Sequence, residues 1–313
     1  MSVDQNIAAV LASVVEAGGK KIHESTPIEA RSGYRALTFD SRTQEQVVPV
    51  GSVQDISVPG AVGQLRARVY RPEGEGPFPT IAFFHGGGFV IGDLDTHDNM
   101  SRDVCRGSRA VVVAVDYRLA PEHRFPAAVD DAVAATKWVA ENAQRLGGND
   151  TVAVAGDSAG GNLSAVVAQQ LKADGIPLAG QFLIYPAVAQ PDAVYPSRAE
   201  NGAGYFLETE SIEWFYSHYI GEQCNAKDSR LAPLHASQLS GLPPAVIVTA
   251  EFDPLRDEGE AYGHALRDAG VWAEVKRCEG MIHGFFDMGR WSPAAQEAIE
   301  ENCKRFGDVL RES

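Results

Sequence analysis

A serine at position 158 lies in the run Gly156-Asp157-Ser158-Ala159-Gly160, which has the pattern G-x-S-x-G. In this pattern the serine occupies a sharp turn between a strand and a helix, and the glycines let neighbouring backbone pass close by. The turn exposes the hydroxyl at the N-terminus of the helix, where amide groups and the helix dipole favour negative charge. A serine in this setting is suited to attack a carbonyl carbon.

A glycine run could stabilise the negative charge that such an attack creates. The sequence His-Gly-Gly-Gly-Phe occupies residues 85–89, directly after the apolar residues 80–84. Backbone amides in a glycine run are not shielded by side chains, so they can donate hydrogen bonds to the oxyanion of a tetrahedral intermediate. The amide after the nucleophile, that of Ala159, is expected to help them.

The serine hydroxyl also needs a base, and four histidines follow Ser158 in the chain. In sheets of this type the order along the chain is serine, acid, histidine. His264 lies inside a helical pattern, and His218 and His235 fall in or near an aromatic-rich segment. His283 lies in a loop after the last expected strand, and it is therefore the predicted base.

The carboxylate that orients the base should lie after the preceding strand, residues 245–249. Asp253 is best placed, because the proline that follows it cannot continue a strand and fixes the turn. Glu251 is the weaker alternative. Asp257 is more suited to cap or open the next helix.

The rest of the chain alternates strand-like and helix-like stretches, which predicts an α/β fold with a mostly parallel sheet of about eight strands. Its ligand site should lie beyond the carboxyl ends of the strands. The first two expected strands alternate apolar and polar residues, which indicates an antiparallel pair at a sheet edge. The expected strands are residues 47–58, 64–70, 80–84, 110–115, 151–154, 181–185, 245–249 and 272–277. The expected helices are residues 4–18, 126–146, 159–173, 257–269 and 293–310.

One long segment, between residues 185 and 245, is rich in aromatic residues and does not fit this alternation. A structureless loop of that length would be unusual, so we expect a helical insertion packed over the sheet. Its aromatic side chains could line an acyl pocket or form a small core of the insertion itself.

Composition excludes several functions. The net charge of −15 and the isoelectric point of about 4.9 argue against nucleic acid or an anionic membrane as a partner. The four cysteines are scattered without metal-ligand spacing, so neither a metal nor a cofactor is expected. No secretory signal or membrane span is visible, which favours a cytoplasmic location.

Five motifs together resemble the hormone-sensitive-lipase-like branch of the α/β-hydrolases, the bacterial family IV esterases. They are HGGGF at residues 85–89, DYRLAPE at 116–122, GDSAGGN at 156–162, DPLRDEG at 253–259 and HGF at 283–285. The resemblance extends from about residue 51 to the C-terminus, with the motifs in the order and spacing of that family. We expect the DYRLAPE motif to be structural rather than catalytic.

The resemblance implies a role for each motif. Ser158 would be the nucleophile, Asp253 the orienting acid and His283 the base, while the amides of Gly86, Gly87 and Ala159 would form the oxyanion hole. It also implies a cap over the active site and a preference for esters with short to medium acyl chains. The expected boundaries are 1–46 for the N-terminal part of the cap, 47–187 and 229–313 for the hydrolase core, and 188–228 for the cap insertion. The expected substrate-binding residues are Phe89, Tyr185, Phe206, Trp214, Leu255 and Ile282.

Other readings share parts of this pattern. Plant gibberellin receptors, which resemble the same branch, bind a small hormone and lack the catalytic histidine, whereas His283 is present here. An amidase or a lactonase would use the same triad, so the triad cannot separate these activities from ester hydrolysis. The sequence therefore predicts a serine carboxylesterase acting on a small-molecule ester, with a homodimer through the edge strand near Trp272 as a further expectation.

Overall fold

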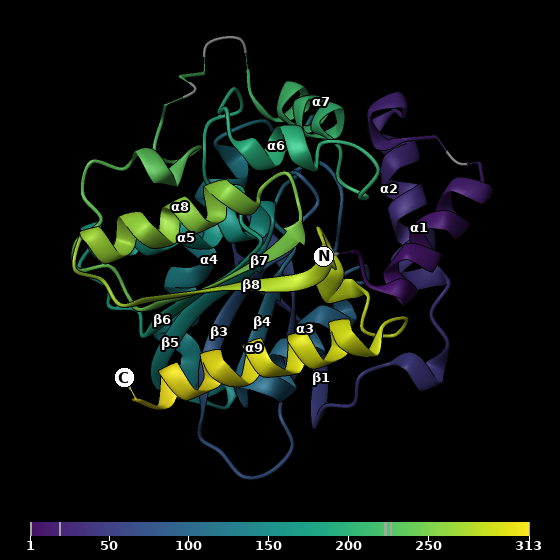
Figure 1. Cartoon of the computed structure of the whole chain (residues 1–313). Helices are drawn as coiled ribbons and strands as arrows, with labels where there is room; N and C mark the ends of the chain where they lie inside the picture. The colour runs from purple at the N-terminus through teal and green to yellow at the C-terminus, as the bar shows by residue number, and fades with distance from the viewer. Residues whose placement is uncertain (1, 19, 222–223, 226, 313) are drawn as a thin grey trace.

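The structure is a computed structural model that describes residues 2–18, 20–221, 224–225 and 227–312. Within these residues eight strands form one sheet in the order β1-β2-β4-β3-β5-β6-β7-β8 (Figure 1). The strands are β1 (Ser52–Pro59), β2 (Gln64–Arg71), β3 (Phe78–Phe84), β4 (Val111–Val115), β5 (Gly148–Asp157), β6 (Gly180–Ile184), β7 (Ala245–Phe252) and β8 (Ala273–Ile282). β2 pairs antiparallel with β1 and with β4, and the other neighbours are parallel. This confirms the predicted α/β sheet with an antiparallel pair at one edge.

The described helices are α1 (Gln5–Glu16), α2 (Pro27–Arg35), α3 (Asp98–Ser108), α4 (Ala127–Asn142), α5 (Ala159–Ala173), α6 (Pro196–Glu200), α7 (Thr209–Tyr219), α8 (Arg256–Asp268) and α9 (Pro293–Glu312). The five helices expected from the sequence are all present. Helices α2 and α3 were not predicted, because both are short and rich in polar residues. None of the described helices is long and apolar enough to cross a lipid bilayer.

The central strands are covered on both faces, which explains their continuous apolar sequences. Successive side chains of a strand point to opposite faces of the sheet. In β3, Ala82 and Phe84 belong to the core that contains residues of α4 and α5, whereas Ile81 and Phe83 belong to the core with α3 and α9. Figure 1 shows α9 and α3 on one side of the sheet and α4, α5 and α8 on the other.

The parallel part of the sheet determines where the functional loops meet. β5, β6, β7 and β8 are consecutive neighbours and run in the same direction. The loops that follow β5, β7 and β8 therefore emerge at one edge of the sheet. Those loops carry Ser158, Asp253 and His283, so the topology brings the three residues together.

Helices α2 and α7 lie above this edge of the sheet, although about 180 residues separate them in the chain (Figure 1). The aromatic-rich insertion is helical as expected, with α6 and α7 inside it. The division into cap and core at residues 46, 187 and 228 remains a prediction, but both expected cap segments contribute to the covered pocket described below.

Candidate active site

Ser158 occupies a strained turn between β5 and α5. Its backbone angles are φ 53° and ψ −115°, in a region that residues with a side chain rarely adopt. The glycines on either side are required by close packing, as the sequence predicts. A Cβ at Gly160 would overlap the carbonyl oxygen of Phe84, and one at Gly156 would overlap the backbone of Gly160.

The structure brings the three predicted residues into a hydrogen-bonded chain. The Oγ of Ser158 lies 3.0 Å from Nε2 of His283, and Nδ1 of His283 lies 2.8 Å from Oδ2 of Asp253. Asp253 is fully buried, and its other carboxylate oxygen accepts the amide proton of Leu255 at 2.8 Å. The carboxylate is therefore held in place from both sides, and it can fix both the tautomer and the orientation of the imidazole.

The alternative acids serve other contacts. Glu251 accepts the backbone amide proton of Gly280 at 2.8 Å, so it braces the strand that leads to His283. Asp257 lies in the first turn of α8, where it accepts the amide proton of Ser197 at 2.8 Å and pairs with Arg256. Asp257 therefore belongs to the start of α8, as expected from its position.

The three alternative histidines lie away from the serine. His218 packs against Trp214 on α7, His235 contacts Gln190, and His264 is exposed on α8. None of these three lines the pocket beside Ser158, whereas His283 does.

The glycine run lies beside the serine, but its first amide is not available to a substrate. The N–H of Gly86 donates to Oδ1 of Asp157 at 2.7 Å, and Gly86 is not among the residues that line the pocket. Gly87, Gly88 and Ala159 do line it. Because the Gly86 amide holds a neighbouring carboxylate, the geometry favours the amides of Gly87 and Gly88 over that of Gly86 for the predicted oxyanion hole.

A mostly apolar pocket opens beside Ser158 and His283, and residues far apart in the sequence form its wall. Residues from the N-terminal segment are Ile22, Tyr34, Leu37 and Thr38. Residues from the insertion are Phe206, Leu207, Ile212, Phe215 and Tyr216. Four of the expected substrate-binding residues line the pocket: Phe89, Tyr185, Phe206 and Leu255. The two segments expected to form a cap thus cover the same cavity.

Trp214 and Ile282 are not among the residues that line this pocket, so their part in substrate binding stays a prediction that the pocket does not support. Ile282 directly precedes His283 and is fully buried in the core between the sheet and α9. Trp214 lies on α7 next to Phe215, but neighbouring helical residues point in different directions. Phe215 faces the pocket, and Trp214 packs against His218 on the same helix.

Several further pocket residues follow a helical spacing. Tyr34, Leu37 and Thr38 in the N-terminal segment are spaced i, i+3 and i+4, and so are Ile212, Phe215 and Tyr216 on α7. Residues with this spacing share one face of a helix. The spacing alone could have shown that these side chains lie together, but not that the face they form covers the active site.

Backbone strain is concentrated around the pocket. Four residues other than glycine with positive φ line it, namely Phe89 (64°), Ser158 (53°), Tyr185 (34°) and Phe206 (75°). Such conformations persist only where the surrounding structure enforces them, and they occur preferentially at functional sites. The ring of Tyr185 also packs against His283, with 4.6 Å between the ring centres, and helps to position the imidazole.

Comparison with known proteins agrees with this geometry. Residues 81–287 match the family model described as alpha/beta hydrolase fold. The chain belongs to the α/β-hydrolase family. Its relatives place it in the hormone-sensitive-lipase-like branch that the motifs predict.

Several of the similar proteins are named as esterases. The chain is 43% identical to esterase LipI of Mycobacterium tuberculosis, over 85% of each chain. It is 36% identical to an ethyl acetate hydrolase of Pseudomonas putida, over 96% of each chain. Among solved structures, the esterase of the archaeon Pyrobaculum calidifontis superposes with a TM-score of 0.94 at 39% identity and covers 99% of both chains.

Proposed function

We propose that this α/β-hydrolase is a carboxylesterase that cleaves short- to medium-chain acyl esters through an acyl-enzyme intermediate. The observation that carries the proposal is the chain of hydrogen bonds from Ser158 through His283 to the buried Asp253. The pocket beside it is lined mostly by apolar side chains, which suits an acyl chain. The names of its esterase relatives support the same reaction.

The geometry defines the first half of the reaction. The hydroxyl of Ser158 donates its proton to Nε2 of His283, while the protonated Nδ1 of His283 donates to Asp253. Oγ attacks the ester carbonyl, and the carbonyl oxygen takes up negative charge. The amides of Gly87, Gly88 and Ala159, which line the pocket, stabilise this oxyanion.

The second half releases the acid. His283 returns the proton to the departing alcohol, which leaves the acyl group bound to Ser158. Water then enters, loses a proton to His283 and attacks the acyl carbonyl. Breakdown of the second tetrahedral intermediate returns the proton to Ser158 and frees the carboxylic acid.

The first test is steady-state turnover of p-nitrophenyl butyrate by the wild type and by Ser158→Ala. We expect the variant to lose activity by about six orders of magnitude, because a triad nucleophile contributes roughly that factor to kcat. Turnover by the variant close to that of the wild type would exclude Ser158 as the nucleophile.

A substrate panel tests the reaction class. p-Nitrophenyl esters and p-nitroanilides with the same acyl group, and lactones with the same number of acyl carbons, should be compared at one pH. The proposal predicts the highest kcat/KM for the esters of short to medium chain. Higher values for anilides or lactones would reassign the enzyme as an amidase or a lactonase.

We also propose a cellular location and an oligomeric state for the enzyme. The net charge of −15 suits a freely dissolved cytoplasmic protein without nucleic acid or membrane partners. The edge strand β8 and the 45% exposed side chain of Trp272 beside it offer a surface for a homodimer. Light scattering of the wild type and of Trp272→Glu would show whether a dimer forms there.

A further inference from the structure

A buried group of ionisable side chains lies directly behind the glycine run, outside the triad. It consists of His97, Asp157, Asp287 and Tyr34, which we call the His97 cluster. Nε2 of His97 lies 3.4 Å from the hydroxyl of Tyr34 and 3.7 Å from Oδ2 of Asp157. The hydroxyl of Tyr34 donates to Oδ2 of Asp287 at 3.0 Å. The members come from four segments: the N-terminal segment, the loop before α3, the end of β5 and the loop after β8.

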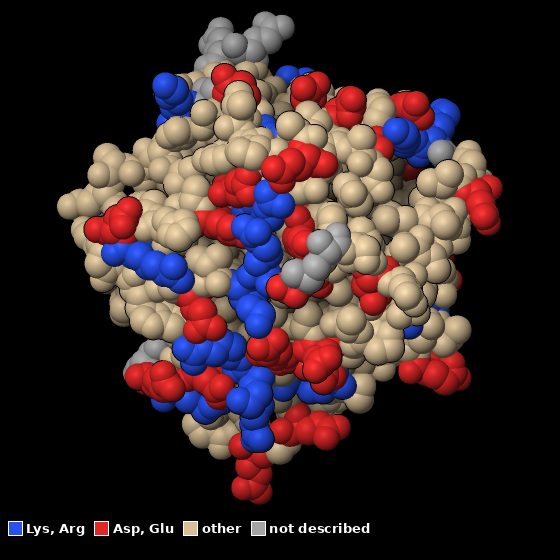
Figure 2. All heavy atoms as spheres, viewed as in Figure 1, with Lys and Arg blue, Asp and Glu red and all other residues tan. Residues whose placement is uncertain are grey.

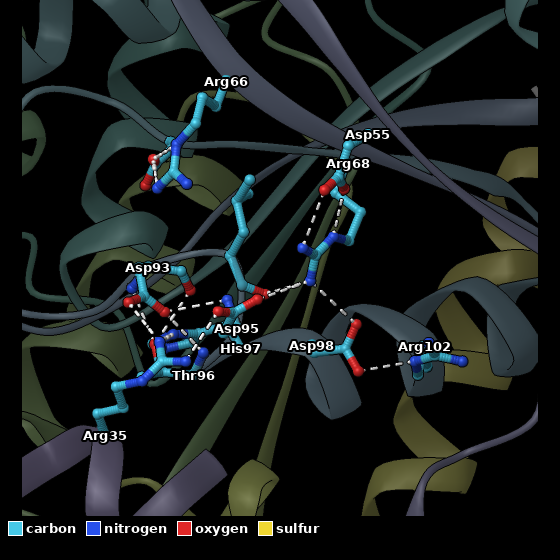
Figure 3. Close-up of polar contacts among 12 residues, drawn as sticks. Arg35, Asp55, Arg66, Arg68, Asp93, Asp95, Thr96, His97, Asp98 and Arg102 are labelled. Atoms are coloured by element: carbon cyan, nitrogen blue, oxygen red, sulfur yellow. Dashed lines mark hydrogen bonds and ion pairs between the residues drawn. The ribbon is translucent and has the colours of Figure 1, made fainter. Parts of the chain in front are cut away.

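Each ring nitrogen of His97 faces oxygen atoms that can accept a hydrogen bond. The hydroxyl of Thr96 donates its single proton to the carbonyl of Asp93 at 3.0 Å. The Thr96 oxygen also lies 3.0 Å from Nδ1 of His97, and while its proton goes to Asp93 it can accept a hydrogen bond from a protonated Nδ1. Figure 3 shows Thr96 and His97 in this loop, beside Asp93 and Asp95.

The other ring nitrogen, Nε2, also faces oxygen atoms that can accept. The hydroxyl proton of Tyr34 points to Asp287, so towards Nε2 of His97 the Tyr34 oxygen can only accept. The other neighbour of Nε2 is the carboxylate of Asp157, which also accepts. Both ring nitrogens thus face oxygen atoms that can accept, and only the charged imidazolium form of histidine can donate to both sides at once.

The surrounding charges favour this form. Burial would lower the pKa of His97, but the carboxylates of Asp157, Asp287 and Asp93 outweigh burial and raise it above the ordinary value. The neighbouring His85 shows the opposite behaviour, because burial and the charge of His97 lower its pKa to about 4. The two rings are 5.1 Å apart, so the same part of the fold favours the charged form of one histidine and the neutral form of the other.

The cluster is connected to both catalytic loops. Asp157 is adjacent to the nucleophile in the sequence, and its Oδ1 accepts the amide proton of Gly86, which fixes the start of the glycine run. Asp287 lies four residues after His283, in the loop that carries the base. A charge at His97 therefore attracts carboxylates from both sides of the reacting centre.

The cap reaches the same loop through one face of α2. Arg31, Tyr34 and Arg35 are spaced i, i+3 and i+4, and Arg31 donates to the carbonyl of Val90 at 2.8 Å. Arg35 pairs with Asp93 and Asp95, as Figure 3 shows. Tyr34 lies between the two arginines and also lines the pocket.

We propose that His97 is a buried imidazolium and a positioning residue, which holds Asp157 and Asp287 so that the glycine run and the His283 loop keep their catalytic geometry, and that Tyr34 completes the cluster from the cap. The inference rests on the proposed esterase function. It adds to the triad a second charged centre that does not touch the substrate.

The first experiment reads the charge directly and does not depend on activity. The wild type and His97→Gln are labelled with ¹⁵N-histidine, and the ring nitrogen signals lost in the variant are assigned to His97. At pH 6.5 these signals should have the shifts of an imidazolium with both nitrogens protonated. Shifts of a neutral ring with one bare nitrogen would overturn the proposal.

The second experiment measures positioning by kinetics. For p-nitrophenyl acetate, His97→Gln should lower kcat roughly tenfold to a hundredfold with little change in KM, because small displacements of catalytic groups have effects of this size. Tyr34→Phe should lower kcat in the same direction by a smaller factor. If His97→Gln does not fold, Tyr34→Phe carries this test.

The matched control is Tyr219→Phe on α7. The hydroxyl of Tyr219 is buried and has no hydrogen-bond partner within the described part of the chain, and Tyr219 does not line the pocket. This variant should keep the kcat of the wild type. An equal loss of kcat in Tyr219→Phe and Tyr34→Phe would overturn the role of Tyr34.

The pH dependence distinguishes positioning by charge from a merely structural role. The groups that face His97 are Asp157, Asp287, Asp93, Tyr34 and His85. The ratio of wild-type kcat to that of His97→Gln should fall as the pH rises above 6.5, since the wild type then loses the charge that the variant lacks. A ratio that is constant with pH, or near one throughout, would contradict the proposal. A wild type without ester hydrolysis would instead contradict the proposed function, and the nitrogen shifts would still decide the charge.

Discussion

The three reacting residues are held rigidly before a substrate arrives. Ser158 is fixed by a strained turn, and Asp253 is buried and held by the amide of Leu255 as well as by His283. Preorganised groups of this kind need no rearrangement in the transition state. At this scale the imidazole is the centre of the site, because it contacts both the nucleophile and the acid.

Replacing Asp253 by Asn tests the role of the acid. The amide would favour the wrong tautomer of His283, so kcat should fall by about four orders of magnitude while the fold is kept. Steady-state kinetics with p-nitrophenyl butyrate and a circular dichroism spectrum measure the two effects.

Asp257→Asn is the matched control, since Asp257 lies four residues further on and contacts Ser197 and Arg256 instead of a histidine. It should retain kcat within about a factor of ten. A loss of kcat in Asp257→Asn as large as that in Asp253→Asn would show that the acid of the triad is wrongly assigned.

At this scale the sequence is highly informative, but not complete. The order of Ser158, Asp253 and His283, each in a loop after a strand, was enough to select the triad. The sequence could not show that the side chain of Asp157 turns back and binds the first amide of the glycine run. That contact joins two loops that are far apart in the chain, so it cannot be predicted from the sequence of either loop alone.

At the scale of elements, the pocket is built where α7 and the segment that begins with α2 cover the carboxyl edge of the sheet. The sequence predicted a helical insertion from its length and its aromatic content. It could not show which helical face is covered, because aromatic residues occur on both faces of α7. The sequence therefore favoured Trp214 as a binding residue, whereas Phe215 beside it lines the pocket.

This assignment predicts how substrate length is controlled. Ile212→Ala shortens a side chain of the pocket wall and so enlarges the pocket. The preferred acyl chain in a series of p-nitrophenyl esters should therefore become longer. One or two methylene groups change the ratio of kcat/KM values by roughly tenfold or more.

Trp214→Ala removes a larger side chain from the same helix, but outside the pocket. It should leave the ranking of the esters unchanged, even if it lowers stability. A change in ranking caused by Trp214→Ala and not by Ile212→Ala would contradict the assigned face of α7.

At the scale of the whole molecule, the surface and the interior use charge in different ways. Figure 2 shows acidic and basic side chains interleaved over β8 and α9. Pairs such as Arg277 with Glu260 and Arg305 with Glu274 lie at 2.7 and 2.8 Å on this surface. Exposed pairs of this kind contribute about 0–1 kcal/mol each. The buried His97 cluster is screened much less by solvent and should therefore affect global stability more.

The His97 cluster predicts how stability depends on pH. The pKa of His97 is raised in the folded protein, so its contribution is fully present below about pH 6.5 and is lost as the pH rises through the folded value. Burial raises the pKa of Asp287 to about 6, so the last part of its own ionisation falls at the acidic end of this range, and His97→Gln serves as the reference for that contribution. Urea unfolding between pH 6.5 and 9 should show a stability loss in the wild type that is absent in His97→Gln. Parallel curves of unfolding free energy against pH for the two proteins would contradict the proposed charge on His97.

The eight strands could be predicted from the sequence, since each is an apolar or alternating run bounded by turn residues. The His97 cluster could not, because its members come from four distant segments and meet only when the sheet, α2 and the loop before α3 are assembled. Within a single segment, each of these residues resembles an ordinary polar loop or helix residue.

The most direct test of the central claim is to trap the acyl-enzyme. The wild type is mixed with excess p-nitrophenyl butyrate, quenched in acid within the first turnovers, digested and analysed by mass spectrometry. We expect one butyryl group on the peptide that contains Ser158, together with a burst of p-nitrophenol equal to the enzyme concentration. Butyrate release without acylation of Ser158, or acylation at another residue, would contradict it.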